Sequence, residues 1–208
     1  MSNVASFQTQ FDVSRETIDL LVAYEELLRK WTKRINLVSK STLDDAWNRH
    51  FWDSAQVFAA MTPGSRRVAD FGSGGGLPGL VIAIISKELS PETVTTLVES
   101  DVRKAAFLST VARALELQVD VRSERIEKIS TLGCDVLTAR ALASLDKLLP
   151  MAKQHLRQDG YSLFLKGQRY QEEVEVARGA WDFDLEVKES QTQPGAALLK
   201  VTNLRAKS

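Results

Sequence analysis

A glycine-rich segment at residues 70–79, DFGSGGGLPG, constrains the fold of this 208-residue chain more than any other feature. An apolar run ends at Phe71, and helix-compatible apolar residues follow at 80–85. Glycines at a strand-to-helix junction permit positive φ and let a ligand approach the backbone without meeting a Cβ. Pro78 stands where a helix begins, a position at which its missing N–H costs little. The segment therefore predicts a loop that offers backbone donors and a helix N-terminus to a polar ligand.

The residues around this loop indicate which cofactor it holds. The dinucleotide fingerprint G-x-G-x-x-G/A is broken, because the sixth position counted from Gly72 is Leu77. Asp70 instead stands two residues before the first glycine, and an apolar run at 94–98 ends on Glu99. A carboxylate at that strand tip can accept both hydroxyls of a ribose, and Asp70 is placed to meet a cationic amino acid group. These features resemble S-adenosylmethionine methyltransferases of the Rossmann-like class I. The cofactor residues predicted from them are Asp70, Gly72, Ser73, Gly74, Gly76, Leu77, Pro78 and Glu99.

From residue 66 onward the pattern alternates between strands and helices. Strands are expected near 67–71, 94–99, 118–122, 135–140, 161–166, 182–189 and 197–203, and helices near 78–89, 102–116, 144–157 and 169–179. The alternation predicts an α/β fold with a doubly wound, mostly parallel sheet. Residues 1–65 are expected to form an N-terminal helical extension that packs on the core, and residues 66–208 the cofactor-binding methyltransferase domain, as one structural unit.

Two helices are predicted in the N-terminal extension. Ser14 can cap the first helix, and apolar residues then recur at helical spacing as far as Ile35. Thr42 and Asp45 resemble a capping box for a second helix, which ends at Pro63-Gly64.

Composition indicates a cytoplasmic protein. Its charge indicates that any attraction to nucleic acid comes from a local patch and not from the net charge of the molecule. The chain has 27 basic and 27 acidic residues, so no net field attracts nucleic acid. The N-terminus lacks a secretion signal, no apolar run spans a bilayer, and a single cysteine fits a reducing compartment. One local basic patch can supply phosphate contacts or can equally be a solvated helix face; it consists of Arg29, Lys30, Lys33, Arg34 and Lys40.

The chain lacks the motifs of several competing methyl-transfer chemistries. The Asn/Asp-Pro-Pro-aromatic motif of amine methylation is replaced by residues 138–141, TARA. Cys134 precedes an apolar strand and is expected to pack rather than act as a nucleophile. His50 and His155 are far apart, and no cluster has metal-ligand spacing, so no metal site is predicted.

Several separated motifs agree with one known family. In chain order they are Asn36-Leu37, Arg49-His50, Asp53-Ser54, residues 70–79, residues 97–100 (LVES), Arg140-Ala141 and Lys166-Gly167. Together they resemble the bacterial 16S ribosomal RNA guanine-N7 methyltransferases, the glucose-inhibited division protein B family, from about Leu20 to the C-terminus.

The resemblance implies a reaction and a set of site residues. The reaction is methylation of guanine N7 in the 530 loop of 16S rRNA, with S-adenosylmethionine as cofactor. The S-adenosylmethionine site would include Gly72, Leu77, Ile126, Glu127 and Arg140, although Glu124 departs slightly from the family pattern beside Ile126. Because N7 carries a lone pair and no proton, in-line transfer is expected to need no general base, and no catalytic acid or base is named.

Substrate contacts are predicted from the strand tips and the N-terminal helices. Arg140 at the end of the fourth strand can bind the cofactor carboxylate or the RNA backbone. Lys166, at the tip of the fifth strand, can anchor a phosphate together with Arg169. Arg49 and His50 are candidates at the RNA entrance, and Arg49 can also form a helical pair with Asp53. The predicted substrate-binding set is Asn36, Arg49, His50, Lys166 and Arg169.

Three other functions remain open at this point: a small-molecule or protein methyltransferase, a nicotinamide-dependent oxidoreductase, and a non-catalytic ribosome-assembly factor. The expected partner is 16S rRNA, within the small subunit or an assembly intermediate, with no membrane. The enzyme is expected to act as a monomer.

Overall fold

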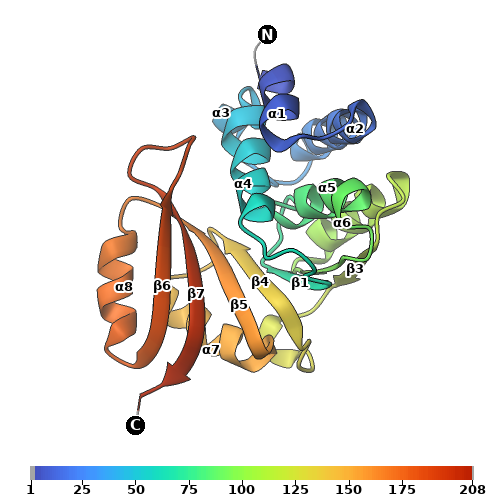
Figure 1. The fold of residues 1–208 in the computed structure, drawn as a ribbon. Helices are drawn as coiled ribbons and strands as arrows, with labels where there is room; N and C mark the ends of the chain where they lie inside the picture. Colours follow the sequence, from blue (N-terminus) through green and yellow to red (C-terminus); the bar gives the residue numbers. More distant parts are fainter. Residues whose placement is uncertain (1–2, 208) are drawn as a thin grey trace.

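The computed structural model describes residues 3–207, and its central feature is a seven-stranded sheet in the order β3-β2-β1-β4-β5-β7-β6 (Figure 1). The strand β7 pairs antiparallel with both β5 and β6, and the other neighbouring strands pair parallel, so the predicted mostly parallel sheet is confirmed. The strands are β1 (Arg67–Phe71), β2 (Val94–Val98), β3 (Val119–Arg122), β4 (Cys134–Arg140), β5 (Leu156–Lys166), β6 (Trp181–Glu189) and β7 (Ala197–Ala206).

Helices cover both faces of the sheet, as the doubly wound fold requires. They are α5 (Gly79–Leu89), α6 (Val102–Ala114), α7 (Leu145–His155) and α8 (Tyr170–Arg178). Side chains alternate along a strand, and in β2 Leu97 joins the hydrophobic cluster of α5 and α6, whereas Val98 joins the cluster of α7 and α8. The sheet is therefore buried between two helical layers.

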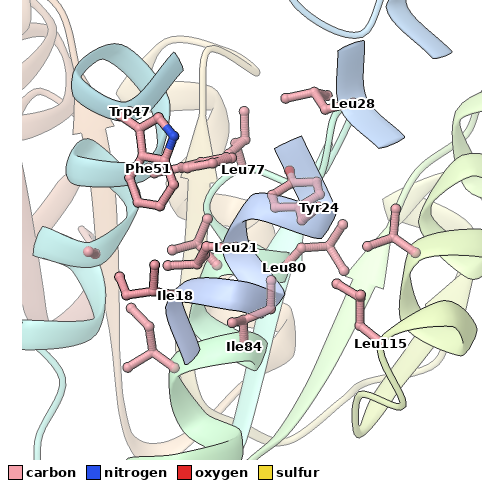
Figure 2. Close-up of a cluster of buried hydrophobic side chains, with 14 of the residues drawn as sticks. Ile18, Leu21, Tyr24, Leu28, Trp47, Phe51, Leu77, Leu80, Ile84 and Leu115 are labelled. Carbon is pink, nitrogen blue, oxygen red and sulfur yellow. The ribbon is translucent and has the colours of Figure 1, made fainter. Parts of the chain in front are cut away.

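The N-terminal helices pack on α5 and α6 rather than forming a core of their own. They begin with α1 (Asn3–Phe11), which the sequence patterns did not predict, and α2 (Arg15–Thr32), which Ser14 caps through the amide of Thr17. Ile18, Leu21 and Tyr24 of α2 share one buried cluster with Leu80 and Ile84 of α5 (Figure 2). The expected helix to Ile35 ends three residues early, at Thr32, and the amides of Arg34 and Ile35 both donate to the carbonyl of Trp31 in the turn that follows.

The capping box predicted at Thr42 and Asp45 is wrong. The hydroxyl of Ser39 accepts the amide of Thr42 and so starts a helix one turn earlier, α3 (Lys40–Leu43), while Asp45 accepts a hydrogen bond from Asn48. The expected single helix is then divided into a π-helical segment, η1 (Trp47–Trp52), and α4 (Asp53–Ala59).

The boundary predicted between α7 and β5 is also wrong. Leu156 begins β5 directly after α7 and pairs with Cys134, five residues before the expected strand start. The register shifts between Cys134 and Val136. A Cβ on Gly160 would lie 2.8 Å from the Cys134 carbonyl oxygen, so a glycine permits this close approach.

Candidate active site

The glycine-rich loop follows β1 at the carboxyl edge of the parallel strands, where open α/β sheets bind ligands. Gly72, Gly74 and Gly76 all have positive φ, between 53° and 86°. At Gly79, the first residue of α5, an added Cβ would lie 2.3 Å from Leu97 and 2.7 Å from the carboxylate of Asp70. The loop therefore needs glycine both for its backbone conformation and for its close packing on the strands.

Asp70 holds this loop from below. Its side chain is fully buried, and the carboxylate accepts hydrogen bonds from the Thr138 hydroxyl at 2.9 Å and the Gly79 amide at 3.2 Å. Burial raises its pKa to about 6, although the hydrogen bonds and the nearby Arg140 guanidinium oppose that rise. Ser73 adds a hydrogen bond from its hydroxyl to the Asp70 carbonyl. Asp70 thus fixes the N-terminus of α5 and does not border the cavity above it.

Glu99 connects the tip of β2 to the same loop. One carboxylate oxygen accepts the amide of Gly74 at 2.9 Å, and the other accepts the amide of Asp101 at 2.8 Å. Each oxygen has a further lone pair, and the side chain borders a cavity of about 410 Å³. Glu99 is therefore oriented before any ligand binds.

The cavity beside Glu99 is bordered by the tips of β1, β2 and β4 and by the 3₁₀ turn η2 (Ile126–Lys128). The predicted cofactor residues that border it are Gly72, Gly74, Glu99, Ile126 and Glu127. Lys104 and residues 141–143 also border it; none was predicted as a site residue, although Ala141 belongs to the Arg140-Ala141 motif. Ser73, Gly76, Leu77 and Pro78 belong to the buried part of the glycine loop and its helix start, so they support the wall rather than border it.

A second cavity of about 380 Å³ lies over the tips of β4, β5 and β7. It shares Ala141 and Ala143 with the first cavity, so the two are neighbours across one short segment. Of the predicted substrate residues, Arg49, His50 and Lys166 border it, while Asn36 and Arg169 are exposed and border neither cavity. Arg140, predicted for the cofactor, borders the second cavity instead.

Arg140 is a deeply placed cation without a carboxylate partner in hydrogen-bonding contact within the described part of the chain. Its guanidinium donates to the Arg49 carbonyl at 3.3 Å and to Nδ1 of His50 at 3.2 Å. Burial lowers its pKa, and Asp53 and the other acidic groups nearby raise it. The arginine therefore joins the tip of β4 to η1 and places positive charge at the wall between β4 and the N-terminal helices.

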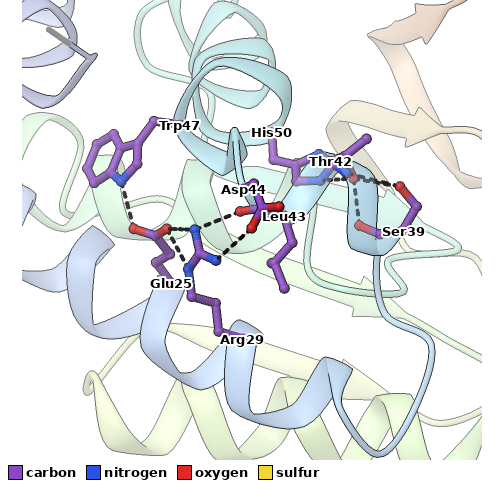
Figure 3. Close-up of polar contacts among 8 residues, drawn as sticks. All are labelled: Glu25, Arg29, Ser39, Thr42, Leu43, Asp44, Trp47 and His50. Atoms are coloured by element: carbon purple, nitrogen blue, oxygen red, sulfur yellow. Dashed lines mark hydrogen bonds and ion pairs between the residues drawn. The ribbon is translucent and has the colours of Figure 1, made fainter. Parts of the chain in front are cut away.

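His50 is neutral near physiological pH. Burial, and then the charge of Arg140, lower its pKa to about 4. Its Nε2 lies 2.9 Å from the Thr42 hydroxyl, which in turn contacts Ser39 (Figure 3). Because Nδ1 accepts from Arg140, Nε2 carries the proton and donates to Thr42. Both ring nitrogens are thus engaged within the protein.

The other polar groups of the second cavity are held by neighbouring chain segments. The ammonium of Lys166 donates to the Ala143 carbonyl at 2.6 Å and to Glu173 at 2.7 Å, so it fixes the shared wall. The carboxylate of Asp53 accepts from the hydroxyls of Ser190 and Thr192 in the β6–β7 loop. The pair expected between Asp53 and Arg49 is not formed among the described residues. The β6–β7 loop carries no recognisable motif, which is why the sequence did not predict its place at the site.

The part of the chain that the structure describes, residues 3–207, has neither a metal cluster nor a membrane-spanning helix. No group of three or more His, Cys, Asp or Glu side chains in this range is placed to hold a metal ion. Across the same residues, no helix has both the length and the apolar character to cross a membrane.

The sheet order, the glycine loop and the acid at the tip of β2 together define a Rossmann-like, S-adenosylmethionine-dependent methyltransferase. Solved structures share the fold. A methyltransferase from Geobacter sulfurreducens superposes with a TM-score of 0.58 at 14% identity, covering 88% of each chain. The M. jannaschii protein TYW2, crystallised with AdoMet, gives a TM-score of 0.56 at 14% identity over 85% of this chain and 80% of that one.

The particular family follows from sequence similarity. The model of the family described as "rRNA small subunit methyltransferase G" (GidB) matches residues 17–198. Proteins named ribosomal RNA small subunit methyltransferase G are 49% identical in Ruegeria sp. (strain TM1040), over 92% of this chain and 93% of that protein, and 49% identical in Rhodospirillum centenum, over 95% and 89%. The chain belongs to the rRNA small subunit methyltransferase G family, and S-adenosylmethionine is its cofactor.

Proposed function

We propose that this protein transfers the methyl group of S-adenosylmethionine to N7 of a guanine in the 530 loop of 16S rRNA. Family membership supports an rRNA of the small subunit as the substrate. The sequence motifs around Arg49, Arg140 and Lys166 support the N7 position and the 530 loop. The structural observation that carries the proposal is the pair of cavities separated only by residues 141–143.

The first cavity suits the cofactor. Glu99 accepts the two ribose hydroxyls through the lone pairs left free by Gly74 and Asp101. Ile126 and Glu127 border the adenine, and Gly72 and Gly74 bring the backbone close to the rest of the molecule. Asp70, Ser73, Gly76, Leu77 and Pro78 keep the loop in shape from beneath.

The second cavity holds the guanine and needs no base. The bound cofactor supplies an electrophilic methyl group on a sulfonium, and guanine N7 offers a lone pair without a proton. His50 is neutral and bonded at both nitrogens, so it orients Arg140 and does not remove a proton. The chain's contribution is therefore to position the two reactants and exclude water.

The second cavity is bordered by the cations Arg49, Arg140 and Lys166 as well as by two carboxylates, so the carboxylates, and not the charge of the cavity as a whole, suit this chemistry. The purine ring gains positive charge as N7 is methylated, and fixed negative groups around it stabilise the transition state. Asp53 and Glu173 both border the cavity. Their carboxylates also provide acceptors for the N1–H and amino donors of guanine, which stay free when N7 reacts. Asn36 and Arg169, exposed outside the cavity, contact the RNA around the target base.

The testing experiment is transfer of labelled methyl groups to small ribosomal subunits that lack this modification, and to the RNA extracted from them. We expect label in 7-methylguanosine at a single site after digestion to nucleosides. A neutral protein gains little from non-specific attraction to RNA, so we expect faster transfer to a subunit or assembly intermediate than to bare RNA, catalysed by the monomer. Label in another nucleoside, or none despite cofactor binding, would contradict the proposed reaction.

A further inference from the structure

A groove of about 490 Å³ lies between α2 and α6, outside both cavities of the active site. Its apolar surface comes from Leu27, Trp31 and Ile35, and its cations are Lys30, Arg34 and Arg103. Residues 27, 30, 31 and 34 recur at three- and four-residue spacing, which places them on one side of α2 and the turn after it. The sequence therefore puts an aromatic ring between two cations on the face that α2 turns toward α6.

Trp31 is anchored but not covered. Its ring packs on Phe107 of α6 with centroids 5.6 Å apart, and the side chain is only half-buried. Leu27 and Ile35 are likewise partly buried against the same core. The indole thus has a fixed position and leaves part of its surface to the groove.

The charges at the groove favour an anionic ligand. Lys30 and Arg34 have no carboxylate within 4.0 Å among residues 3–207, and none of the residues bordering the groove is acidic. Arg103 contacts Asp101 at 3.1 Å, but its side chain is 73% exposed. In a chain with zero net charge, these three cations form a local concentration of positive charge, with no acidic residue among the described residues that border the groove.

The groove lies next to the active site. Arg103 borders the groove, while the next residue, Lys104, borders the cofactor cavity. On the other side, the segment after α2 reaches the glycine loop, since the Leu37 carbonyl oxygen would lie 3.4 Å from a Cβ on Gly75. The groove and the cofactor cavity are therefore bordered by consecutive residues of α6.

From this arrangement we propose that the groove binds an unpaired nucleotide of the rRNA substrate, distinct from the reacting guanine. Its base stacks on Trp31, and its flanking phosphates contact Lys30, Arg34 and Arg103. Single-stranded nucleotides are bound in this way, by an aromatic platform beside cations, with little dependence on sequence. The inference rests on the proposed rRNA substrate, and it adds a second anchoring point for that RNA.

The test compares Trp31→Ala and Trp31→Phe in binding to unmodified small subunits and to their extracted RNA. Loss of one base stack is expected to raise the dissociation constant about 5- to 100-fold, while Trp31→Phe keeps most of the affinity. The KM for the subunit should rise in parallel, with kcat at saturation and S-adenosylmethionine affinity unchanged. Equal RNA affinity in Trp31→Ala and wild type would overturn the proposal.

A charge reversal keeps the proposal testable if Trp31→Ala fails to fold. Lys30→Glu is expected to weaken RNA binding and to make the slope of log K against log salt about one unit shallower. Lys153→Glu is the matched control, because Lys153 is exposed in the last turn of α7, borders neither active-site cavity and has no ion pair among the described residues; it should behave as wild type. Equal effects of the two reversals would overturn the proposal, because the groove would then contribute nothing beyond general charge.

Cross-linking identifies the occupant directly. With a photoreactive amino acid in place of Arg34, irradiation of the complex with small subunits should join the protein to 16S rRNA. An adduct with a ribosomal protein instead would overturn the nucleotide assignment while leaving the methylation reaction intact. If wild type binds neither subunits nor RNA, the proposed function fails, a result distinct from a failure of the groove alone.

Discussion

At the scale of single residues, the carboxylate of Glu99 does two things at once. It accepts the Gly74 and Asp101 amides, so it fixes the glycine loop against the tip of β2, and it still borders the cofactor cavity. A group that is already oriented loses little entropy when the ligand binds. The acid at the strand tip is thus useful for its rigidity as much as for its charge.

Glu99→Ala is expected to raise the dissociation constant of S-adenosylmethionine about 10- to 100-fold, because hydrogen bonds to a charged group contribute about 1.5–3 kcal/mol. The dissociation constant of Glu99→Gln should lie between those of wild type and Glu99→Ala, since the amide oxygen of glutamine still accepts one hydrogen bond. Titration calorimetry measures the affinities. Glu124→Ala removes another carboxylate from the same cavity and is the control for general charge. Equal losses in Glu99→Ala and Glu124→Ala would contradict the ribose contact.

Asp70 makes the stability of the protein depend on pH in an unusual direction. Its pKa is about 6 in the folded protein and near its ordinary value of 3.8 when unfolded. Between these values the folded state keeps a proton that the unfolded state has released, so raising the pH destabilises the fold. The change amounts to about 3 kcal/mol at ~1.4 kcal/mol per pKa unit.

Asp70→Asn should remove this dependence. Urea unfolding of wild type and variant at intervals from pH 4 to 7 gives the difference in unfolding free energy at each pH. From pH 4 to pH 6, we expect the unfolding free energy of wild type to fall by about 3 kcal/mol relative to that of Asp70→Asn. Above pH 6 the difference should stay level. A difference that is constant with pH would show that Asp70 titrates normally and is not desolvated in this way.

At the scale of secondary-structure elements, α2 supports the glycine loop from the N-terminal side. The buried hydroxyl of Tyr24 donates to the carbonyl of Gly75, and Leu28 of the same helix would lie 3.4 Å from a Cβ on that glycine. Glu88 of α5 accepts hydrogen bonds from Ser14 and Thr17 at the start of α2. The helix is therefore joined to both the loop and the helix that follows it.

Tyr24→Phe tests this support. It leaves the Gly75 carbonyl buried without its donor, which should lower the unfolding free energy by about 1–3 kcal/mol, and it should weaken S-adenosylmethionine binding several-fold because the loop loses a fixed point. Tyr161→Phe is the matched control. The Tyr161 hydroxyl accepts a hydrogen bond from the Thr62 amide at 2.6 Å, and Tyr161 borders neither cavity. The control should lose stability and keep its affinity. Unchanged S-adenosylmethionine affinity in Tyr24→Phe would show that this contact from α2 does not support the cofactor site.

The elements that sequence predicts best are those in which local pattern and burial agree. The sequence predicts β1 and α5 directly. The strand β1 is a short apolar run that is buried on both faces, and the apolar helix α5 begins at a proline and a glycine. The π-helical segment η1 is not predictable in this way. Its geometry depends on Trp47, His50 and Phe51 meeting α2 and Arg140, which are contacts between distant parts of the chain.

At the scale of the whole molecule, the second cavity is assembled from segments that are far apart in sequence. Arg49 and Asp53 come from the N-terminal helices, Arg140 from β4 and Gln193 from the β6–β7 loop. The sequence predicted several of these residues one by one, from a motif or a strand tip. It assigned Arg140 to the cofactor, because a strand order shows which edge a residue lies on and not which of two neighbouring cavities its side chain faces.

This shared construction leads to a prediction about unfolding. The N-terminal helices and the sheet-covering helices α5 and α6 bury one continuous hydrophobic cluster, so residues 1–65 have no separate core among the described residues. We expect a single cooperative transition. Three of the four tryptophans, Trp31, Trp47 and Trp52, lie in the N-terminal part, and the fourth is Trp181 in β6. Trp181→Phe therefore makes fluorescence a report on the N-terminal helices alone.

In urea, the fluorescence midpoint of Trp181→Phe should coincide with the midpoint measured by far-ultraviolet circular dichroism, which reports on the whole chain. S-adenosylmethionine should move both midpoints upward together, because it binds the folded state of a single unit. A fluorescence change at lower urea than the loss of circular dichroism would mean that the N-terminal helices detach first. The second cavity would then lose Arg49 and Asp53 while the sheet and the cofactor cavity stayed folded, and cofactor binding would persist without methyl transfer.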